Sequence, residues 1–216
     1  MMTLIIATMV YHYYLFLEHR LKDAYLVHLC KEAQRTGQTT AIFTQSVSET
    51  RRVSRLLDAL KIGVVSLQID LSPSARAASL DKLRRKECHA LVTTDVAATL
   101  GPIPDVDRII NLTLTWKMNP EIYTKRASHI GHAGTSGQVM TFVTQYDMEV
   151  YDRQNKVLGV PLVEYTVDMD SVMSCREQVE EAALEDPSLR DTGLLRAGGR
   201  LKPVGPERAA SSTLGY

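Results

Sequence analysis

The stretch TTAIFTQSVSETRRVSRLLDALKIGVVSLQI, residues 39–69, decides the fold of this 216-residue chain. It opens with a short apolar and β-branched run, TTAIFT, and closes with another, VVSLQI; both predict buried strands. Ser48 is a candidate N-cap for a helix between them. That helix is predicted by apolar residues at helical spacing: Val53, Leu56, Leu57 and Leu60. A strand, a helix and a strand of these lengths predict a right-handed βαβ unit with parallel strands.

The same alternation continues on both sides of this unit. Amphipathic helices are predicted at 19–37, where Gly37 ends the helix, and at 72–87, where Pro73 suits the first turn. Further strands are predicted at 89–97, 107–114 and 137–144. The chain is therefore expected to form an α/β fold, a mostly parallel sheet flanked by helices, with its functional residues at the carboxyl ends of the strands.

Changes in composition along the chain predict four segments. Residues 1–12 are expected to be a ragged N-terminal segment, whose apolar run MMTLIIATMV is either a strand or a ragged start, and 13–167 the folded domain. Residues 168–186 predict a C-terminal helix, and 187–216, which are poor in large apolar residues, predict a disordered and mildly basic tail. The N-terminal run MMTLIIATMV has no basic flank and is shorter than the ~20 residues of a membrane span, so no signal peptide and no membrane association are expected.

Charge and cysteine content narrow the class of protein. The chain has 25 Lys and Arg against 25 Asp and Glu, so any nucleic-acid surface must be a local patch. Its three cysteines lie far apart without CxxC spacing, which argues against a disulfide framework and against a zinc site. An intracellular, reducing compartment is the natural expectation.

The stretch KRASHIGHAGT, residues 125–135, holds two histidines, His129 and His132, in a basic, glycine-punctuated segment. A metal site is disfavoured, because no Cys, Asp or Glu lies within the segment to complete it. General acid or base chemistry lacks an orienting carboxylate. Weak phosphate contacts through Lys125 and Arg126, or a surface turn without a ligand, both stay open.

Four segments in this order carry a family resemblance: AIFTQS, LQIDLSPSARAASLDKLRR, LVTTDVAATLGPIPDVDRIIN and IYTKRASHIGHAGTSGQVMTFVT. From Tyr13 to Thr166 the chain resembles the second, C-terminal RecA-like domain of DEAD-box RNA helicases. KDAYLVHL is similar to the nucleolar, ribosome-biogenesis members. The resemblance implies an RNA partner, a first RecA-like domain or ribonucleoprotein proteins as further partners, and a nuclear or nucleolar location. It implies ATP and Mg²⁺ only when the chain is joined to a first RecA-like domain.

The resemblance also assigns RNA- or phosphate-binding positions, each with a structural alternative. Ser46 would hold a phosphate or cap a helix, and Thr94 and Asp95 would bind a phosphate or organise the end of a strand. The positions carried over from the family are Ser46, Asp70, Arg76, Thr94, Asp95, Lys125 and Arg126. Binding to RNA is expected to be weak, independent of sequence and steeply salt-dependent, since phosphate contacts alone would carry it.

The chain departs from the family where catalysis is concentrated. Thr99, Leu100, Gly101 and Pro102 stand where the family has Arg-Gly-x-Asp. His129 and His132 occupy the two arginine-finger positions, the catalytic positions of the segment. A neutral imidazole offers one donor and no charge, and loss of such a finger costs ~10³–10⁵ in rate. ATP hydrolysis is therefore expected to be impaired.

Neither a Walker-type GxxxxGK[ST] nor an Asp-Glu-Ala-Asp segment occurs in the chain. In the family these belong to the first RecA-like domain, so this chain alone cannot complete the ATP site. Three hypotheses follow: the C-terminal lobe of an RNA helicase in ribosomal RNA processing, a catalytically inactive lobe that binds RNA or protein in a ribonucleoprotein assembly, and an unrelated small-molecule α/β enzyme. Whether the chain is part of a longer helicase or a stand-alone lobe stays open.

Overall fold

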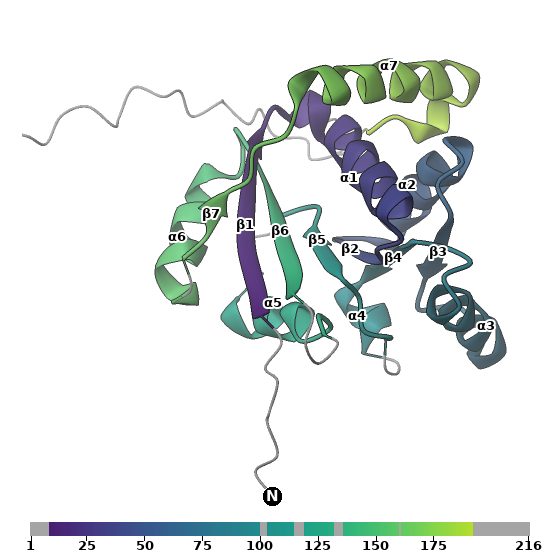
Figure 1. Cartoon of the computed structure of the whole chain (residues 1–216), viewed down its shortest axis with the longest axis horizontal. Helices are drawn as coiled ribbons and strands as arrows, with labels where there is room; N and C mark the ends of the chain where they lie inside the picture. Colours follow the sequence, from purple (N-terminus) through teal and green to yellow (C-terminus); the bar gives the residue numbers. More distant parts are fainter. Residues whose placement is uncertain (1–8, 100–102, 115–118, 132–135, 160, 192–216) are drawn as a thin grey trace, which may run out of the picture.

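The computed structural model describes residues 9–99, 103–114, 119–131, 136–159 and 161–191. Seven strands form one sheet in the order β3-β4-β2-β5-β6-β1-β7, and each pairing is parallel (Figure 1). The strands are β1 (Met9–Leu17), β2 (Thr40–Thr44), β3 (Val64–Leu67), β4 (Ala90–Thr94), β5 (Arg108–Asn111), β6 (Ser136–Thr144) and β7 (Val163–Glu164). The prediction of an α/β fold with a mostly parallel sheet is confirmed.

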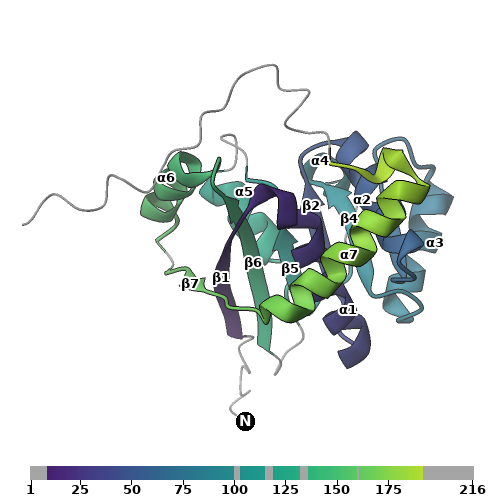
Figure 2. The ribbon, with the colours of Figure 1, turned by 90° about the horizontal axis from the view of Figure 1, so that it is seen from above.

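Helices cover both faces of the sheet, as parallel strands joined by crossovers require. The helices are α1 (Lys22–Thr36), α2 (Val47–Ala59), α3 (Pro73–Arg84), α4 (Asp95–Ala98), α5 (Pro120–Ala127), α6 (Met148–Leu158) and α7 (Met169–Glu185), with 3-10 turns η1 (His19–Leu21) and η2 (Pro187–Leu189). One buried cluster joins α1, α2 and α7 to the sheet, and a second joins α3, α4, α5 and α6 to the other face. Figures 1 and 2 show α7 lying across α1 on the outside of the first of these layers.

Local sequence signals explain where most of these helices begin and end. Gly37 takes the left-handed conformation, with φ of 69°, directly after α1, where a residue with a side chain would be strained. Pro73 opens α3, as predicted. The cap of α2 is Ser46, whose hydroxyl accepts from the Glu49 amide, so the prediction of Ser48 as the cap is wrong. Ser46 has the extended backbone that a cap needs, whereas Ser48 already lies inside the helix.

The N-terminal boundary also differs from the prediction. Residues 9–12, expected to be ragged, belong to β1, which pairs with β6 from Met9 opposite Ser136 to Leu17 opposite Thr144. The extended conformation is maintained by this ladder with a distant strand. Residues 1–8 lie outside the described part of the chain.

At the other end, α7 agrees with the helix predicted at 168–186, but the chain stays packed beyond it. Leu189 in η2 is 3% exposed. Arg52 donates to the Leu189 carbonyl at 3.0 Å and pairs with both carboxylate oxygens of Asp23, at 2.7 and 3.0 Å. Residues 187–191 therefore belong to the domain, which corrects the predicted start of the tail, and 192–216 lie outside the described residues.

Among the residues that the structure describes, no helix combines the length and the apolar character needed to cross a membrane.

Candidate functional site

The ends of β4 and β5 and the end of α5 meet around one ion pair, of which only the arginine is buried. Arg126, in the last turn of α5, donates from Nε and Nη2 to the two carboxylate oxygens of Asp95, each at 2.7 Å. Its Nη1 donates to the Asn111 side-chain oxygen at 2.8 Å. The Arg126 side chain is 5% exposed and that of Asp95 41%. The pair thus joins α5 to the start of α4, with its carboxylate end open to water.

Phe43, from the neighbouring strand β2, packs against this pair. The Arg126 guanidinium carbon lies 4.8 Å from the centre of the Phe43 ring, a cation–π contact. The imidazole of His129 stacks on the same phenyl ring, with ring centres 6.3 Å apart and 18° between planes. Phe43 therefore holds both the arginine and the histidine of the KRASHIGHAGT segment.

The charge state of His129 follows from its surroundings. Burial lowers the pKa of His129, the nearby charge of Lys125 lowers it further, and Asp105 acts in the opposite direction. Since the pKa lies below its ordinary value, the imidazole is neutral at pH 7. His132, the second predicted finger position, lies outside the described residues.

Thr94 and Arg76 hold the short helix α4 in place. The Thr94 hydroxyl accepts from the Ala97 amide at 3.3 Å and so caps α4. Arg76, which is 9% exposed, donates to the Ala97 carbonyl at 2.8 Å. Both residues therefore have structural partners, and the prediction that they contact RNA stays a prediction.

The remaining predicted positions are spread over the same edge and its surroundings. Ser46 follows β2, the neighbour of β4, and caps α2, while Glu49 accepts from the amide of the preceding residue, Gln45, at 2.9 Å. Asp70 is exposed and pairs with Arg51 at 2.9 Å. Lys125 is exposed at the end of α5. The structure thus brings Asp95, Arg126 and His129 together in one site, with Thr94 and Ser46 at adjoining strand ends.

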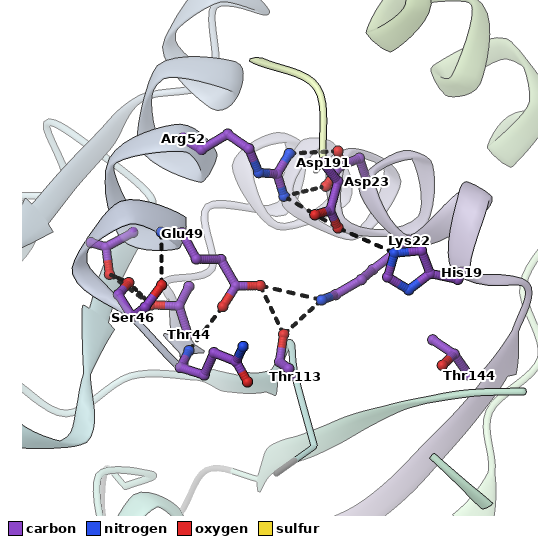
Figure 3. Close-up of polar contacts among 12 residues, drawn as sticks. His19, Lys22, Asp23, Thr44, Ser46, Glu49, Arg52, Thr113, Thr144 and Asp191 are labelled. Carbon is purple, nitrogen blue, oxygen red and sulfur yellow. Dashed lines mark hydrogen bonds and ion pairs between the residues drawn. The ribbon is translucent and has the colours of Figure 1, made fainter. Parts of the chain in front are cut away.

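Sequence reasoning missed a second polar cluster, shown in Figure 3. The Lys22 ammonium donates to Glu49 at 3.2 Å and to the Thr113 hydroxyl at 2.6 Å, and Thr113 donates to Glu49 at 2.8 Å. The Lys22 side chain is 6% exposed and that of Glu49 13%. A lysine in an amphipathic helix ordinarily predicts a solvated position, so no local signal identifies this one. The cluster ties α1, α2 and the segment after β5 together behind the strand ends.

Asn111 was also missed, although it carries a weak signal. It is a polar residue that directly follows two buried apolar ones, Ile109 and Ile110, and it is fully buried. Buried amides require hydrogen-bond partners, and here they are Arg126 and Thr141. Such a residue at a carboxyl strand end is a reasonable candidate for organising a site.

Within the described ranges, no group of three or more His, Cys, Asp or Glu side chains is placed to hold a metal ion. Asp95, the carboxylate nearest the site, is occupied by Arg126.

Comparison with known proteins adds to this geometry. Residues 21–134 match the family described as the helicase conserved C-terminal domain. The chain is 44% identical over 169 residues to the ATP-dependent rRNA helicase rrp3 of Aspergillus fumigatus, covering 78% of this chain and 35% of that protein. It is 43% identical to rrp-3 of Neurospora crassa, covering 78% and 32%. The chain thus spans about a third of the length of these relatives.

Solved structures agree on the fold. The C-terminal domain of the DEAD-box protein Dbp5 matches with a TM-score of 0.66 at 22% identity, covering 80% of this chain and 97% of that one. The E. coli DEAD-box protein SrmB, solved with the regulator RraA, matches with a TM-score of 0.68 at 21% identity, covering 76% and 94%. Both likenesses show the architecture of the sheet and its helices.

Proposed function

The chain belongs to the helicase conserved C-terminal domain family, in its DEAD-box branch, and from that premise we propose that it is the C-terminal RecA-like lobe of an RNA helicase acting in ribosomal RNA processing. The support is the similarity to rRNA helicases over 78% of the chain. A nuclear or nucleolar location and partners in a ribonucleoprotein assembly follow from the same proposal. ATP and Mg²⁺ would be held mainly by a first RecA-like domain, to which the phosphate-binding motifs of the family belong.

Contact with RNA is assigned to the carboxyl edge of the sheet. Lys125 is exposed in the last turn of α5, and Ser46 and Thr94 place hydroxyls on neighbouring strand ends. Arg76 and Arg126 already donate to Ala97, Asp95 and Asn111, so we assign them to holding α4 and α5 in place. Binding should be weak and governed by phosphate contacts, whatever the base sequence.

One observation supports slow ATP hydrolysis: the placement of His129. In the family this position is an arginine, which would bring a fixed charge and a fork of donors to a phosphoryl group. Here an imidazole lies flat on Phe43, half-buried, with its pKa lowered by burial and by Lys125. A neutral ring in that place cannot stabilise developing negative charge as a guanidinium does.

The test joins the complete chain to the first RecA-like domain of an active relative and measures ATP turnover at saturating RNA. We expect a rate lower by ~10³ or more than that of the relative's own two domains, because a lost finger costs ~10³–10⁵. His129→Arg with His132→Arg should recover part of that rate. Full recovery should also need the Arg-Gly-x-Asp segment in place of residues 99–102, and the two repairs should be non-additive because both serve one closed state.

Lys125→Arg is the matched control, because it alters an exposed cation in the same segment while keeping its charge. Turnover by the unmodified fusion at the relative's rate would contradict the proposal of impaired hydrolysis. A second function is favoured by the same neutral imidazole: a catalytically inactive lobe kept as an RNA- or protein-binding module. RNA binding without turnover in the doubly repaired fusion would favour this second function.

A further inference from the structure

Lys22 is a buried cation whose partners both follow the carboxyl ends of strands (Figure 3). Its Nζ donates to Oε1 of Glu49, in the first turn of α2, at 3.2 Å, and to Oγ1 of Thr113, after β5, at 2.6 Å. Thr113 in turn donates to the same Oε1 of Glu49 at 2.8 Å. Three residues from three parts of the chain therefore close a ring of hydrogen bonds, the Lys22–Glu49–Thr113 ring.

The second oxygen of the Glu49 carboxylate leads from this ring to the turn between β2 and α2. Its Oε2 accepts from the backbone amide of Gln45 at 2.9 Å, and the Glu49 backbone amide donates to the Ser46 hydroxyl at 3.1 Å. Gln45 and Ser46 are the two residues between β2, which ends at Thr44, and α2, which begins at Val47. Glu49 therefore holds both residues of the turn.

Donor and acceptor chemistry fixes the orientation of that carboxylate. An ammonium only donates, so the Thr113 oxygen accepts from Lys22 and its hydroxyl proton is left for Glu49. With Oε1 engaged twice, the carboxylate cannot rotate away from the Gln45 amide without losing both of these bonds. Water competes little for them, because the Lys22 side chain is 6% exposed and that of Glu49 13%.

Gln45 lies at the carboxyl end of a central strand. The strand β2 runs between β4 and β5, and Thr44, the residue before Gln45, pairs with Thr94. Gln45 is exposed, and within the described residues its side-chain amide has no hydrogen-bond partner. The Ser46 hydroxyl, by contrast, already accepts from the Glu49 amide. Gln45 therefore presents the available amide of this turn.

We propose that Lys22, Glu49 and Thr113 are positioning residues that hold Gln45 for contact with the sugar–phosphate backbone of RNA. The binding of RNA at this edge is part of the proposed function, on which this role of Gln45 rests. A side-chain amide can donate to a phosphate oxygen, and it can both donate to and accept from a ribose 2′-hydroxyl. Because the amide is neutral, its contact releases no counterion and adds affinity without steepening the salt dependence.

The test measures binding of the complete chain to a fluorescein-labelled oligouridine over a range of salt concentrations. Gln45→Ala should weaken binding roughly three- to tenfold, the worth of one hydrogen bond, at an unchanged salt slope. Lys22→Met with Glu49→Gln removes both charges at constant net charge, so it should weaken binding to a similar extent, also at an unchanged slope. Its Gln45 amide proton should move upfield in the NMR spectrum, because the carboxylate acceptor is lost.

Combining the variants separates positioning from a general structural effect. When Gln45→Ala is already present, Lys22→Met with Glu49→Gln should cost no further affinity, because the ring acts on RNA only through Gln45. Arg176→Met with Glu180→Gln is the matched control, since it removes an exposed ion pair of α7 at constant net charge and should change neither affinity nor the Gln45 signal. If the ring variant fails to fold, Thr113→Val, which removes only the hydroxyl of the ring, takes its place.

Affinity losses that add in the combined variant would overturn the inference, and so would unchanged binding by Gln45→Ala. An oligodeoxyuridine of equal length identifies the group contacted: an equal loss for both polymers supports a phosphate contact, and a loss confined to RNA supports a 2′-hydroxyl contact. An unmodified chain that does not bind the oligouridine would contradict the proposed function as well. Binding that Lys125→Ala weakens and Gln45→Ala does not would overturn the role of Gln45 alone.

Discussion

Breaking the pair between Arg126 and Asp95 should destabilise the chain for a different reason on each side. In Asp95→Asn, the buried guanidinium loses its counter-charge. Breaking a buried pair costs ~3–5 kcal/mol, and since the Asp95 side chain is 41% exposed, water can partly replace it, so we expect a loss of ~2–3 kcal/mol in the free energy of unfolding. In Arg126→Met, the exposed carboxylate simply rehydrates, and methionine keeps the packing on Phe43.

The cost of Arg126→Met comes mainly from Asn111. Its side-chain oxygen is left without the arginine donor in a fully buried position, which costs ~1–3 kcal/mol, and a further ~0.5–1 kcal/mol of cation–π contact is lost. We therefore expect ~2 kcal/mol for this variant, less than or equal to the cost of Asp95→Asn. The double variant leaves no uncompensated charge, so it should be more stable than the sum predicts by ~1–2 kcal/mol.

Urea unfolding of the complete chain measures these values, provided that the slope of the free energy against urea stays constant among the variants. The control is Asp70→Asn, whose exposed pair with Arg51 should contribute less than ~1 kcal/mol. Additivity of the two single variants within ~0.5 kcal/mol would refute the coupling, and so would a loss in Asp95→Asn no larger than that of the control.

Three further outcomes are expected. Arg52→Met should lower the free energy of unfolding in urea by ~3 kcal/mol, because it leaves Asp23 buried without its partner, and proteolysis near Leu189 should quicken; unchanged cleavage there would contradict the packing of η2. Lys125→Ala should weaken single-stranded RNA binding for all base sequences and reduce the salt slope by ~0.7, whereas a loss confined to one sequence would count against a phosphate contact. Burial raises the pKa of Cys30 to about 12, so iodoacetamide at pH 8 should modify it only in urea, and rapid modification of the native chain would disagree with that burial.

The alternation of strands and helices could be predicted because it depends on local periodicity. The run TAIFT is buried at each position, as a central parallel strand requires, and the apolar residues of α2 face the core. The strand β1 was only partly predicted, because its apolar residues merge with those of 1–8 and no turn signal separates them. Its conformation depends on β6, a partner at the other end of the domain.

The candidate site, like the fold, could be predicted only in part from the sequence. Residue types at Asp95, Arg126 and His129 were identified from the chain, and the structure brings them together. Whether a charged residue serves a ligand or an internal partner is a question of tertiary distance, so the pairing of Arg126 with Asp95 could not be foreseen. The same holds for Lys22, whose burial depends on Glu49 and Thr113 arriving from other elements.

The position of β1 in the sheet has a consequence for how the protein is made. A ribosome delivers this strand well before its neighbour β6, because Met9 pairs with Ser136 and Leu17 with Thr144. Pairings between segments so distant in sequence are slow to form. The intervening chain must lose conformational entropy to bring the two strands together before their stabilising contacts form. Until β6 emerges, the apolar and aromatic face of β1 has no partner strand, and the nascent chain is open to aggregation or to binding by chaperones. Synthesis rate and chaperone supply, rather than equilibrium stability alone, should therefore control how much of this domain accumulates in a cell.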